Sequence, residues 1–481
     1  MVVNSIIFWL FFAVVSLPYF VLLRKSYKAQ NLWLLLASYF FYGWADWKMI
    51  PLLAIITIVF YWLGLQIKKN NKDNPKRASH LTTLGVVLGV GVLFYFKYLG
   101  FFVQEFAHLF ESFGLNAHLS TFSIIMPIGI SFFTFKLISY VLEIHRENIQ
   151  PTKDFIQFAT FIAFFPTILS GPIDRPGEFI PQLNKSRQFD YDNVAEGTRR
   201  IIWGLFLKVC IADRLFGYTS AVLDNYSHHN ATSILIAVLL YSFEMYADFS
   251  GYSEMAIGVS QLLGLKVREN FHRPFLSQNT SEYWRRWHMS LTTWITDYIY
   301  MPLNVRFRNL GQYGMYIAIF INLVVIGAWH GANWTYVLFG AYHGIILIII
   351  AATERKRRKF EKKYSLKKKA YYKYPRILIT FLLVTVGLII FRASNLSESF
   401  EIMQRLTYGY GLPFVNKTAF VFGIPFILLL IFKEFKDENK YNIHFLHSKR
   451  LSIRIASIII LLICVFLCGN LDGGQFIYFQ F

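Results

Sequence analysis

Long apolar segments recur along the whole 481-residue chain and strongly limit the folds open to it. A helix needs about 20 mostly apolar residues to cross a hydrocarbon core about 30 Å thick. Some segments approach that length, and shorter ones are typical of tilted or re-entrant helices. We therefore predict an all-α polytopic membrane protein with about 10–13 transmembrane or re-entrant helices. The predicted spans are Ile6–Leu23, Leu32–Tyr42, Leu52–Ile67, Leu81–Phe96, Ser123–Leu142, Phe155–Leu169, Thr198–Leu215, Ser233–Tyr246, Tyr316–Trp329, Trp334–Ala351, Ile377–Phe391, Ala419–Phe432 and Ile455–Cys468.

The composition supports a membrane protein and excludes other classes. Charged residues make up 16% of the chain, whereas about 25% is usual for a soluble protein. A hydrophobic share of 55% also excludes a disordered chain. The net charge of +20 indicates cytoplasmic loops and contact with anionic membrane lipids, not a nucleic-acid partner.

Lysine and arginine gather between the predicted spans. The run Thr353–Arg376 alone holds 12 basic and two acidic residues. Because basic loops stay in the cytoplasm, the distribution predicts that the N-terminus and Gly469–Phe481 lie outside. Topology and headgroup contact explain these runs better than a specific site does. No basic region precedes the first apolar run, so we expect Ile6–Leu23 to stay as a helix and not to be cleaved as a signal peptide.

No repeat of fixed period and no Ser/Pro-rich linker divides the sequence. We predict one membrane-embedded domain over residues 1–481, whose middle, about residues 170–342, carries the polar and aromatic residues of a catalytic region. Cys210, Cys464 and Cys468 all lie in apolar segments. We expect them to pack as small hydrophobic residues, without a disulfide framework.

His330 lies in the apolar segment Val324–Trp334. An ionisable residue within a span usually faces a cavity or a partner, because exposing a charged group to lipid costs about 2–3 kcal/mol or more. Gly327 and Gly331 allow a backbone or a ligand to approach closely. An imidazole can take a proton from a hydroxyl and return it. A catalytic histidine and a core histidine bonded to a neighbouring helix both fit these residues.

The segment Ser281–Leu291 holds a second candidate, His288. Tryptophans beside Arg285 and Arg286 are also typical of a membrane interface, where they anchor the chain and contact headgroups. Such an anchor does not require a histidine, which singles out His288. At helical spacing, one face would carry Trp284, Trp287, His288 and Leu291.

Two further segments interrupt the apolar pattern. Asp248, in Tyr246–Ser253, needs a partner; it could orient a histidine, bond a helix end or cap a helix that begins near Ser253, and a structural role is favoured. In Ser170–Pro176, two prolines and a glycine break the helix. At membrane depth such backbone must be buried in protein or line a water-filled cavity. This segment is either a plain loop or part of a cytoplasmic mouth.

Several catalytic motifs are absent from the sequence. There is no Walker loop, His-Glu-x-x-His pair, Cys-x-x-Cys or Gly-x-Ser-x-Gly elbow, which disfavours ATP hydrolysis, zinc hydrolysis and a serine hydrolase. We expect no metal site and no permanently bound cofactor.

Taken together, six stretches resemble the membrane-bound O-acyltransferase family. Within it they are similar to the bacterial branch of alginate and peptidoglycan O-acetyltransferase membrane subunits, to which the D-alanyl transferase of teichoic acid also belongs. The resemblance covers nearly the whole chain. The stretches are Ser170–Ile173, Tyr246–Ser253, Asn270–Phe275, Tyr283–Leu291, Trp329–Gly331 and the ending Phe476–Phe481.

The resemblance implies a many-helix fold around a tunnel that joins the two membrane faces. The family's intramembrane histidine matches His330, and its second functional histidine matches His288, so both are expected to be catalytic. Substrate or donor binding is expected of Trp284, Arg285, Arg286, Trp287, Asp248, Ser250, Trp329 and Asn333.

The implied activity is O-acylation of a cell-surface polysaccharide by a multi-pass protein of the bacterial cytoplasmic membrane. An acyl group, for which acetyl is favoured, would come from a cytoplasmic thioester, either acetyl-coenzyme A or a phosphopantetheine carrier, and a separate extracytoplasmic acyltransferase would be the partner. In this hypothesis His330 is the general base and His288 positions the donor, bonds its carbonyl or shares the proton. Arg285 and Arg286 would attract the donor's phosphates. The alternatives are D-alanyl transfer from a carrier protein to teichoic acid, a glycan or lipid flippase, and a scaffold for another enzyme.

Overall fold

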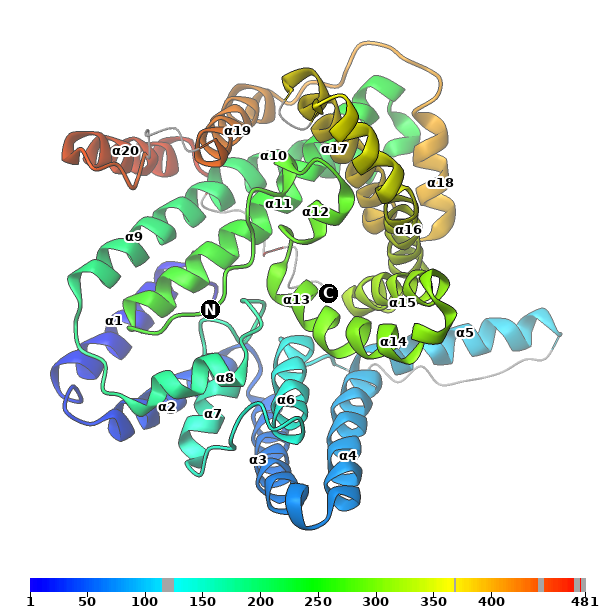
Figure 1. Ribbon diagram of the computed structural model, residues 1–481. Helices are drawn as coiled ribbons and strands as arrows, with labels where there is room; N and C mark the ends of the chain where they lie inside the picture. The colour runs from blue at the N-terminus through cyan, green and yellow to red at the C-terminus, as the bar shows by residue number, and fades with distance from the viewer. Residues whose placement is uncertain (115–124, 367–368, 440–444, 471–475, 477–481) are drawn as a thin grey trace. The chain divides into compact units, whose positions relative to one another are not determined.

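The computed structural model describes residues 1–114, 125–366, 369–439, 445–470 and 476, and every regular element in these ranges is a helix (Figure 1). Seven helices in the described ranges are long and apolar enough to cross a membrane, and the shorter Ile6–Val21 is also apolar. The prediction of an all-α polytopic membrane protein is confirmed. The start of the predicted span Ser123–Leu142 and the ending 477–481 lie outside the described residues.

The described residues form two compact units. Unit 1 comprises Met1–Thr198 and Ala256–Arg268, and unit 2 comprises Arg199–Met255 and Glu269–Phe481. Two helices, α9 (Tyr191–Leu205) and α11 (Ala231–Leu262), contribute residues to both units. The single domain with a catalytic middle stays a prediction.

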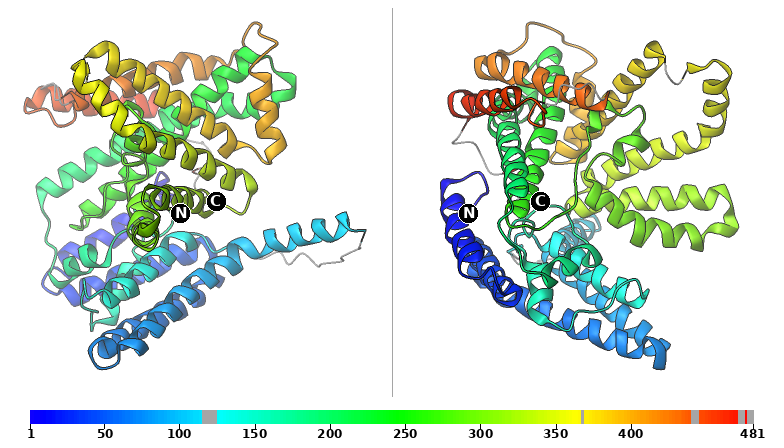
Figure 2. Two further views of the ribbon diagram at one scale, coloured as in Figure 1. Left: turned by 45° about the vertical axis from the view of Figure 1, so that its right-hand side comes forward. Right: turned by 60° about the vertical axis from the view of Figure 1, so that its left-hand side comes forward.

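Unit 1 consists mainly of long apolar helices, and α3, α4 and α6 pack against one another (Figure 1). The run Tyr27–Asp73 spans 47 residues, far more than one bilayer crossing requires, and a 3₁₀ turn at Trp47–Met49 divides it where two spans are predicted. Figure 2 shows α4, η2 and α5 as one long rod. The elements are α1 (Ile6–Val21), α2 (Tyr27–Asp46), η1 (Trp47–Met49), α3 (Ile50–Asp73), α4 (Pro75–Leu93), η2 (Phe94–Tyr98), α5 (Leu99–Ser112), α6 (Ile130–His145), α7 (Phe155–Ala163), α8 (Pro176–Phe179) and η3 (Ile180–Asn184).

The helix break predicted at Ser170–Pro176 is present in unit 1. α7 ends at Ala163 and α8 begins at Pro176, and every residue between them is buried. Part of this irregular backbone is bonded, since the Asp174 carboxylate accepts a hydrogen bond from the backbone N–H of Arg268 at 3.1 Å. Irregular backbone at membrane depth must be buried in protein or line a water-filled cavity, and here it is buried in protein.

Unit 2 contains both predicted catalytic histidines, His288 and His330. Its elements are η4 (Phe206–Ala212), α10 (Asp213–Leu223), η5 (Tyr226–His228), η6 (Pro274–Leu276), α12 (Thr280–Trp284), α13 (Met289–Ile295), η7 (Thr296–Tyr300), α14 (Met301–Arg306), η8 (Arg308–Leu310), α15 (Gln312–His330), α16 (Trp334–Lys363), α17 (Ala370–Arg392), α18 (Leu396–Arg405), η10 (Ala419–Gly423), α19 (Ile424–Glu438), α20 (Leu451–Ile463) and η11 (Cys464–Cys468).

Several predicted spans correspond to interrupted helices. The predicted span Thr198–Leu215 crosses three consecutive elements, α9, the π-helical η4 and α10. Likewise, the predicted span Ala419–Phe432 consists of a π-helical segment followed by α19. A π segment adds a residue to a helical turn. These two predicted spans are therefore built from short consecutive helical elements and not from one long straight helix.

His330 lies at the turn of a tightly packed hairpin formed by α15 and α16. A Cβ atom at Gly327 of α15 would lie 2.1 Å from the backbone oxygen of Tyr336 on α16, and one at Gly340 would lie 2.4 Å from the backbone oxygen of Leu323. The two backbones therefore touch, as the glycine near His330 predicts. Asn333 caps the N-terminus of α16, since its side chain accepts a hydrogen bond from the N–H of Thr335 at 3.0 Å.

Candidate active site

His288 lies at the junction of two short helices. α12 ends at Trp284 and α13 begins at Met289, and His288 has φ 44° and ψ 52° in the left-handed region. The prediction of one continuous helical face over Trp284–Leu291 is therefore wrong, because a left-handed residue interrupts the helix. For a non-glycine residue this conformation costs about 1–3 kcal/mol and persists only where its surroundings fix it.

Asn270 fixes the ring of His288 from a distant part of the sequence. Its side-chain Oδ1 lies 3.0 Å from His288 Nδ1 and accepts hydrogen bonds from the Ser290 hydroxyl at 2.9 Å and the Ser290 N–H at 3.3 Å. Its backbone oxygen accepts from the N–H of Met289 at 2.8 Å. Asn270 and His288 are both 0% exposed. The bonds made by Asn270 thus hold both the strained turn and the imidazole that it carries.

These bonds also select the tautomer of His288. A backbone N–H can only donate, so the Asn270 atom that faces Ser290 must be the oxygen. Consistently, Asn270 Nδ2 donates to the hydroxyl of Ser253 at 3.0 Å. In a neutral imidazole, Nδ1 must then carry the proton that points at this oxygen, and the lone pair lies on Nε2. His288 Nε2 is therefore a hydrogen-bond acceptor and a potential proton acceptor.

Replacing Asn270 with alanine should leave the Ser290 donors and His288 Nδ1–H unsatisfied. The expected loss is about 1–3 kcal/mol of stability, with acyl transfer reduced about 10–100-fold because the ring loses its orienting partner. Denaturation midpoints and transfer rates would measure both effects. Asn225→Ala, at an exposed asparagine of unit 2, is the control and should change neither. An Asn270→Ala protein with wild-type transfer would contradict the role assigned to Asn270.

His330 is the last residue of α15 and lies among aromatic rings. It is 3% exposed, and its ring centroid lies 5.0 Å from that of Phe391 and 6.4 Å from that of Phe339. The ring of Trp329 lies 5.2 Å from that of His330 and 5.8 Å from that of His288. The two predicted histidines therefore come together around Trp329, although 42 positions separate them in the sequence.

A small cavity adjoins His330. Its volume is about 10 Å³, and its lining includes Trp284, Trp287, Phe339 and a third histidine, His343. Trp284 and Trp287 therefore lie close to His330. The space is about that of one water molecule and does not accommodate a thioester. The tunnel between the membrane faces stays a prediction.

Asp248 has a partner, Lys208, that the sequence pattern does not indicate. Its Oδ1 lies 2.7 Å from Lys208 Nζ, which also lies 2.9 Å from Asp213 Oδ1, and all three side chains are buried. The alternative that Asp248 caps a helix near Ser253 is wrong, because α11 runs without a break from Ala231 to Leu262. The triad has the geometry of a structural ion pair, which is the role favoured for Asp248.

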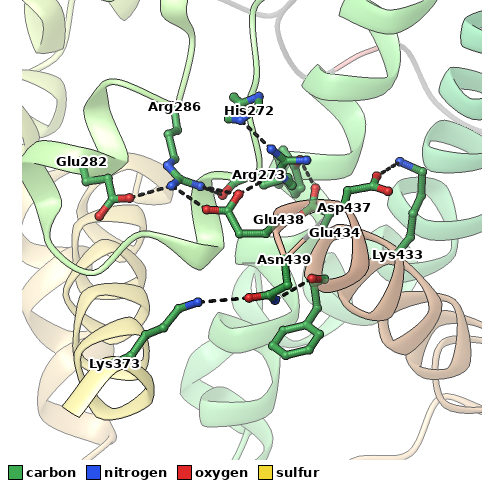
Figure 3. A network of polar contacts seen from close by, with 12 residues as sticks. His272, Arg273, Glu282, Arg286, Lys373, Lys433, Glu434, Asp437, Glu438 and Asn439 are labelled. Carbon is green, nitrogen blue, oxygen red and sulfur yellow. Dashed lines mark hydrogen bonds and ion pairs between the residues drawn. The ribbon is translucent and has the colours of Figure 1, made fainter. Parts of the chain in front are cut away.

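The two predicted arginines lie in different surroundings. Arg285 is exposed, whereas Arg286 is bound by carboxylates: its Nη2 lies 2.6 Å from Glu282 and 2.9 Å from Glu438 (Figure 3). Arg273 pairs with the same Glu438 at 2.9 Å. Arg286 therefore links the α12 turn to the end of α19, and a donor phosphate would have to compete with two carboxylates for it.

Three predicted site residues remain, namely Trp329, Ser250 and Asn333. Trp329 contacts both histidines as described. Ser250 is buried in α11. Asn333 caps α16 and donates to the backbone oxygen of Ser394 at 2.7 Å. In the described residues, no group of three or more His, Cys, Asp or Glu side chains is placed to hold a metal.

The Arg286–Glu438 ion pair should make the stability of the protein depend on pH. Burial raises the pKa of Glu438, but the hydrogen bond from Arg286 and the charges of Arg286 and Arg273 outweigh burial, so its pKa lies below the ordinary 4.5. A lowered carboxyl pKa stabilises the fold above the unfolded-state pKa, and this contribution is lost as pH falls through the folded-state pKa. Glu438→Gln should therefore lower the melting temperature by a constant amount above pH 4.5 and by progressively less below it. Thermal unfolding of both proteins across acid pH measures this, and a pH-independent difference would count against the pair.

His288 and His330 form a buried pair of imidazoles in a protein built of apolar helices, and imidazoles are suited to acid–base chemistry. Residues 36–391 match the model of the MBOAT, membrane-bound O-acyltransferase family. The chain belongs to this family and is an O-acyltransferase of multi-pass membrane type.

Its relatives belong to the predicted bacterial branch. The chain is 36% identical to the "Probable alginate O-acetylase AlgI" of Pseudomonas aeruginosa, over 92% of this chain and 82% of that protein. It is 32% identical to the peptidoglycan O-acetyltransferase of Helicobacter pylori, over 82% of this chain and 77% of that protein. It is 33% identical to the teichoic acid D-alanyltransferase of Streptococcus thermophilus, over 56% of this chain and 69% of that protein. The predicted resemblance is confirmed.

Proposed function

We propose that this protein moves an acetyl group from a cytoplasmic thioester donor across the bacterial cytoplasmic membrane for O-acetylation of an extracytoplasmic cell-surface polysaccharide. The observation that carries the proposal is the buried pair His288 and His330, joined by Trp329, in a member of the membrane O-acyltransferase family. The relatives named as acetylases align over 82–92% of this chain, which favours acetyl as the acyl group.

In the proposed reaction, an acceptor hydroxyl replaces the thiol of the donor, and His330 handles the proton. His330 takes the proton from the acceptor hydroxyl, and the oxygen attacks the carbonyl carbon of the thioester. The new C–O bond forms, the C–S bond breaks, and the proton passes to the thiolate. The products are an ester and a free thiol. The aromatic rings around His330 keep bulk water away from the thioester.

The tautomer of His288 helps to distinguish between proton handling and hydrogen bonding to the donor's carbonyl as its role. With Nδ1–H directed at Asn270 Oδ1, Nε2 bears the lone pair. A neutral ring in this state can accept a proton or a hydrogen bond at Nε2 but cannot donate from it to the donor's carbonyl. This favours the proton-handling role of His288 over the carbonyl-bonding role.

Acetyl-coenzyme A or a phosphopantetheine carrier would supply the acyl group from the cytoplasm. The exposed Arg285, more than the carboxylate-bound Arg286, is suited to meet its phosphates. The immediate acceptor is either the polysaccharide or a separate extracytoplasmic acyltransferase that passes the group on.

Two labelled donors test the proposal. Membrane vesicles containing the protein would receive labelled acetyl-coenzyme A or a carrier protein bearing labelled D-alanine on the cytoplasmic face. Label from acetyl-coenzyme A should reach polysaccharide as an ester and be absent from vesicles that lack the protein. Transfer from the D-alanyl carrier alone would establish the alternative, which the alignment to the D-alanyltransferase keeps open. Flux of glycan without any ester formed would instead indicate a flippase.

A further inference from the structure

His343 is a third histidine beside the histidine pair. It lies on α16, lines the same cavity as His330, and is 0% exposed. In the described part of the chain, neither of its ring nitrogens has a hydrogen-bond partner. This residue lies in the predicted span Trp334–Ala351 but belongs to none of the motifs singled out from the sequence.

The surroundings of His343 are apolar but shaped to its ring. The ring centroid lies 4.8 Å from that of Phe339 and 5.2 Å from that of Trp284, both nearly edge-on. A Cβ atom at Gly387 of α17 would lie 2.5 Å from His343 Nε2. The glycine thus provides the space that the imidazole occupies.

Filling this apolar space with a histidine costs free energy of folding. A neutral imidazole carries one N–H donor and one acceptor nitrogen, and burying such a group without a hydrogen bond costs about 1–3 kcal/mol in proteins. Leucine would fill the volume without that cost. The adjoining cavity of about 10 Å³ is about large enough for one water molecule, which could bond to a histidine on either side of it.

We propose that His343 is a positioning residue for acyl transfer: it holds one water molecule in the shared cavity, and this water bonds to His330 and orients its ring. The inference rests on the proposed function of His330 as general base. A water fixed between the two imidazoles would also solvate the positive charge that His330 acquires when it takes the hydroxyl proton. The proton itself stays with His330 until it passes to the thiolate.

Two variants of similar size separate this role from packing. His343→Leu keeps the apolar volume and removes both nitrogens, whereas His343→Gln keeps a donor and an acceptor. Transfer from labelled acetyl-coenzyme A to polysaccharide would be measured in vesicles, together with the denaturation midpoint of each protein. We expect His343→Leu to lower kcat about 10-fold at unchanged KM and to be no less stable than wild type, and His343→Gln to retain most of the wild-type kcat.

Three results would overturn the inference. They are a wild-type kcat in His343→Leu, an equal loss of kcat in both variants, and a loss that follows reduced stability. The variant His330→Ala in the same vesicles distinguishes the two proposals. If it retains transfer, the proposed function itself fails; if it is inactive while His343→Leu is fully active, only the role of His343 fails.

Discussion

Replacing His330 with alanine is expected to reduce acyl transfer about 10²–10⁴-fold, the usual contribution of a positioned general base. The ring is buried beside the ring of Trp329, which also contacts His288, and alanine offers no group that can take the hydroxyl proton. The measurement is transfer of labelled acetyl to polysaccharide at matched amounts of protein in the membrane.

We expect His330→Ala to fold normally, so that its loss of acyl transfer can be attributed to the missing base and not to unfolding. His330 is the last residue of its helix, and the α15–α16 contact is made by glycines at 327 and 340. We therefore expect His330→Ala to be extracted in detergent as a single folded species. His228→Ala, at an exposed histidine of the same unit, is the matched control and should transfer at the wild-type rate. Transfer by His330→Ala within a few-fold of wild type would refute the assigned base.

Replacing Lys208 with methionine should give the largest loss of stability. Its ammonium is 2.7 Å from Asp248 and 2.9 Å from Asp213, in a region where all three side chains are buried. Removing one partner of a buried ion pair leaves uncompensated charge and typically costs about 3–5 kcal/mol. The ammonium also lies 4.4 Å from the ring centroid of Phe476, so cation–π attraction is lost as well. Denaturation of the purified protein in mixed micelles measures the loss.

Two controls distinguish charge from packing in this experiment. Arg358→Met breaks an exposed i,i+4 pair with Glu354, and such pairs contribute only about 0.3–0.5 kcal/mol. The triple variant Lys208→Met, Asp213→Asn, Asp248→Asn keeps the shape and removes the charge, so it should recover part of the stability lost by Lys208→Met. If the single and triple variants are equally unstable, buried charge is not the cause.

The sequence predicts the membrane class and the two histidines because these depend on local patterns. Apolar length indicates the spans, and the Trp-His motifs mark His288 and His330. The ionisable Lys208 could have been noticed by the same reasoning, since it lies within the predicted span Thr198–Leu215. Its partnership with Asp248, 40 positions away, has no local signature.

The conformation of His288 could not be predicted for a related reason. Helical spacing around Trp284 and Leu291 favours a continuous helix, and nothing local indicates a left-handed residue. The turn is held by Asn270, which precedes it by 18 positions. In the sequence, Asn270 is only the first residue of the stretch Asn270–Phe275, and no role is predicted for it. His343 resembles an ordinary core histidine in sequence, and only the cavity that it shares with His330 distinguishes it.

The π-helical segment η4 constrains how this protein can change by deletion. Lys208 lies within it, between Phe206 and Ala212, and each residue of an α-helix advances the chain by roughly 100° around the axis. Losing one codon just before Lys208 would restore an ordinary helix and rotate Lys208, together with Asp213 that follows it on the same run, relative to Asp248 on α11. The buried carboxylate of Asp248 would then lose its ammonium partner. We therefore expect such a deletion to be tolerated only together with a neutral residue at this position, as in Asp248→Asn.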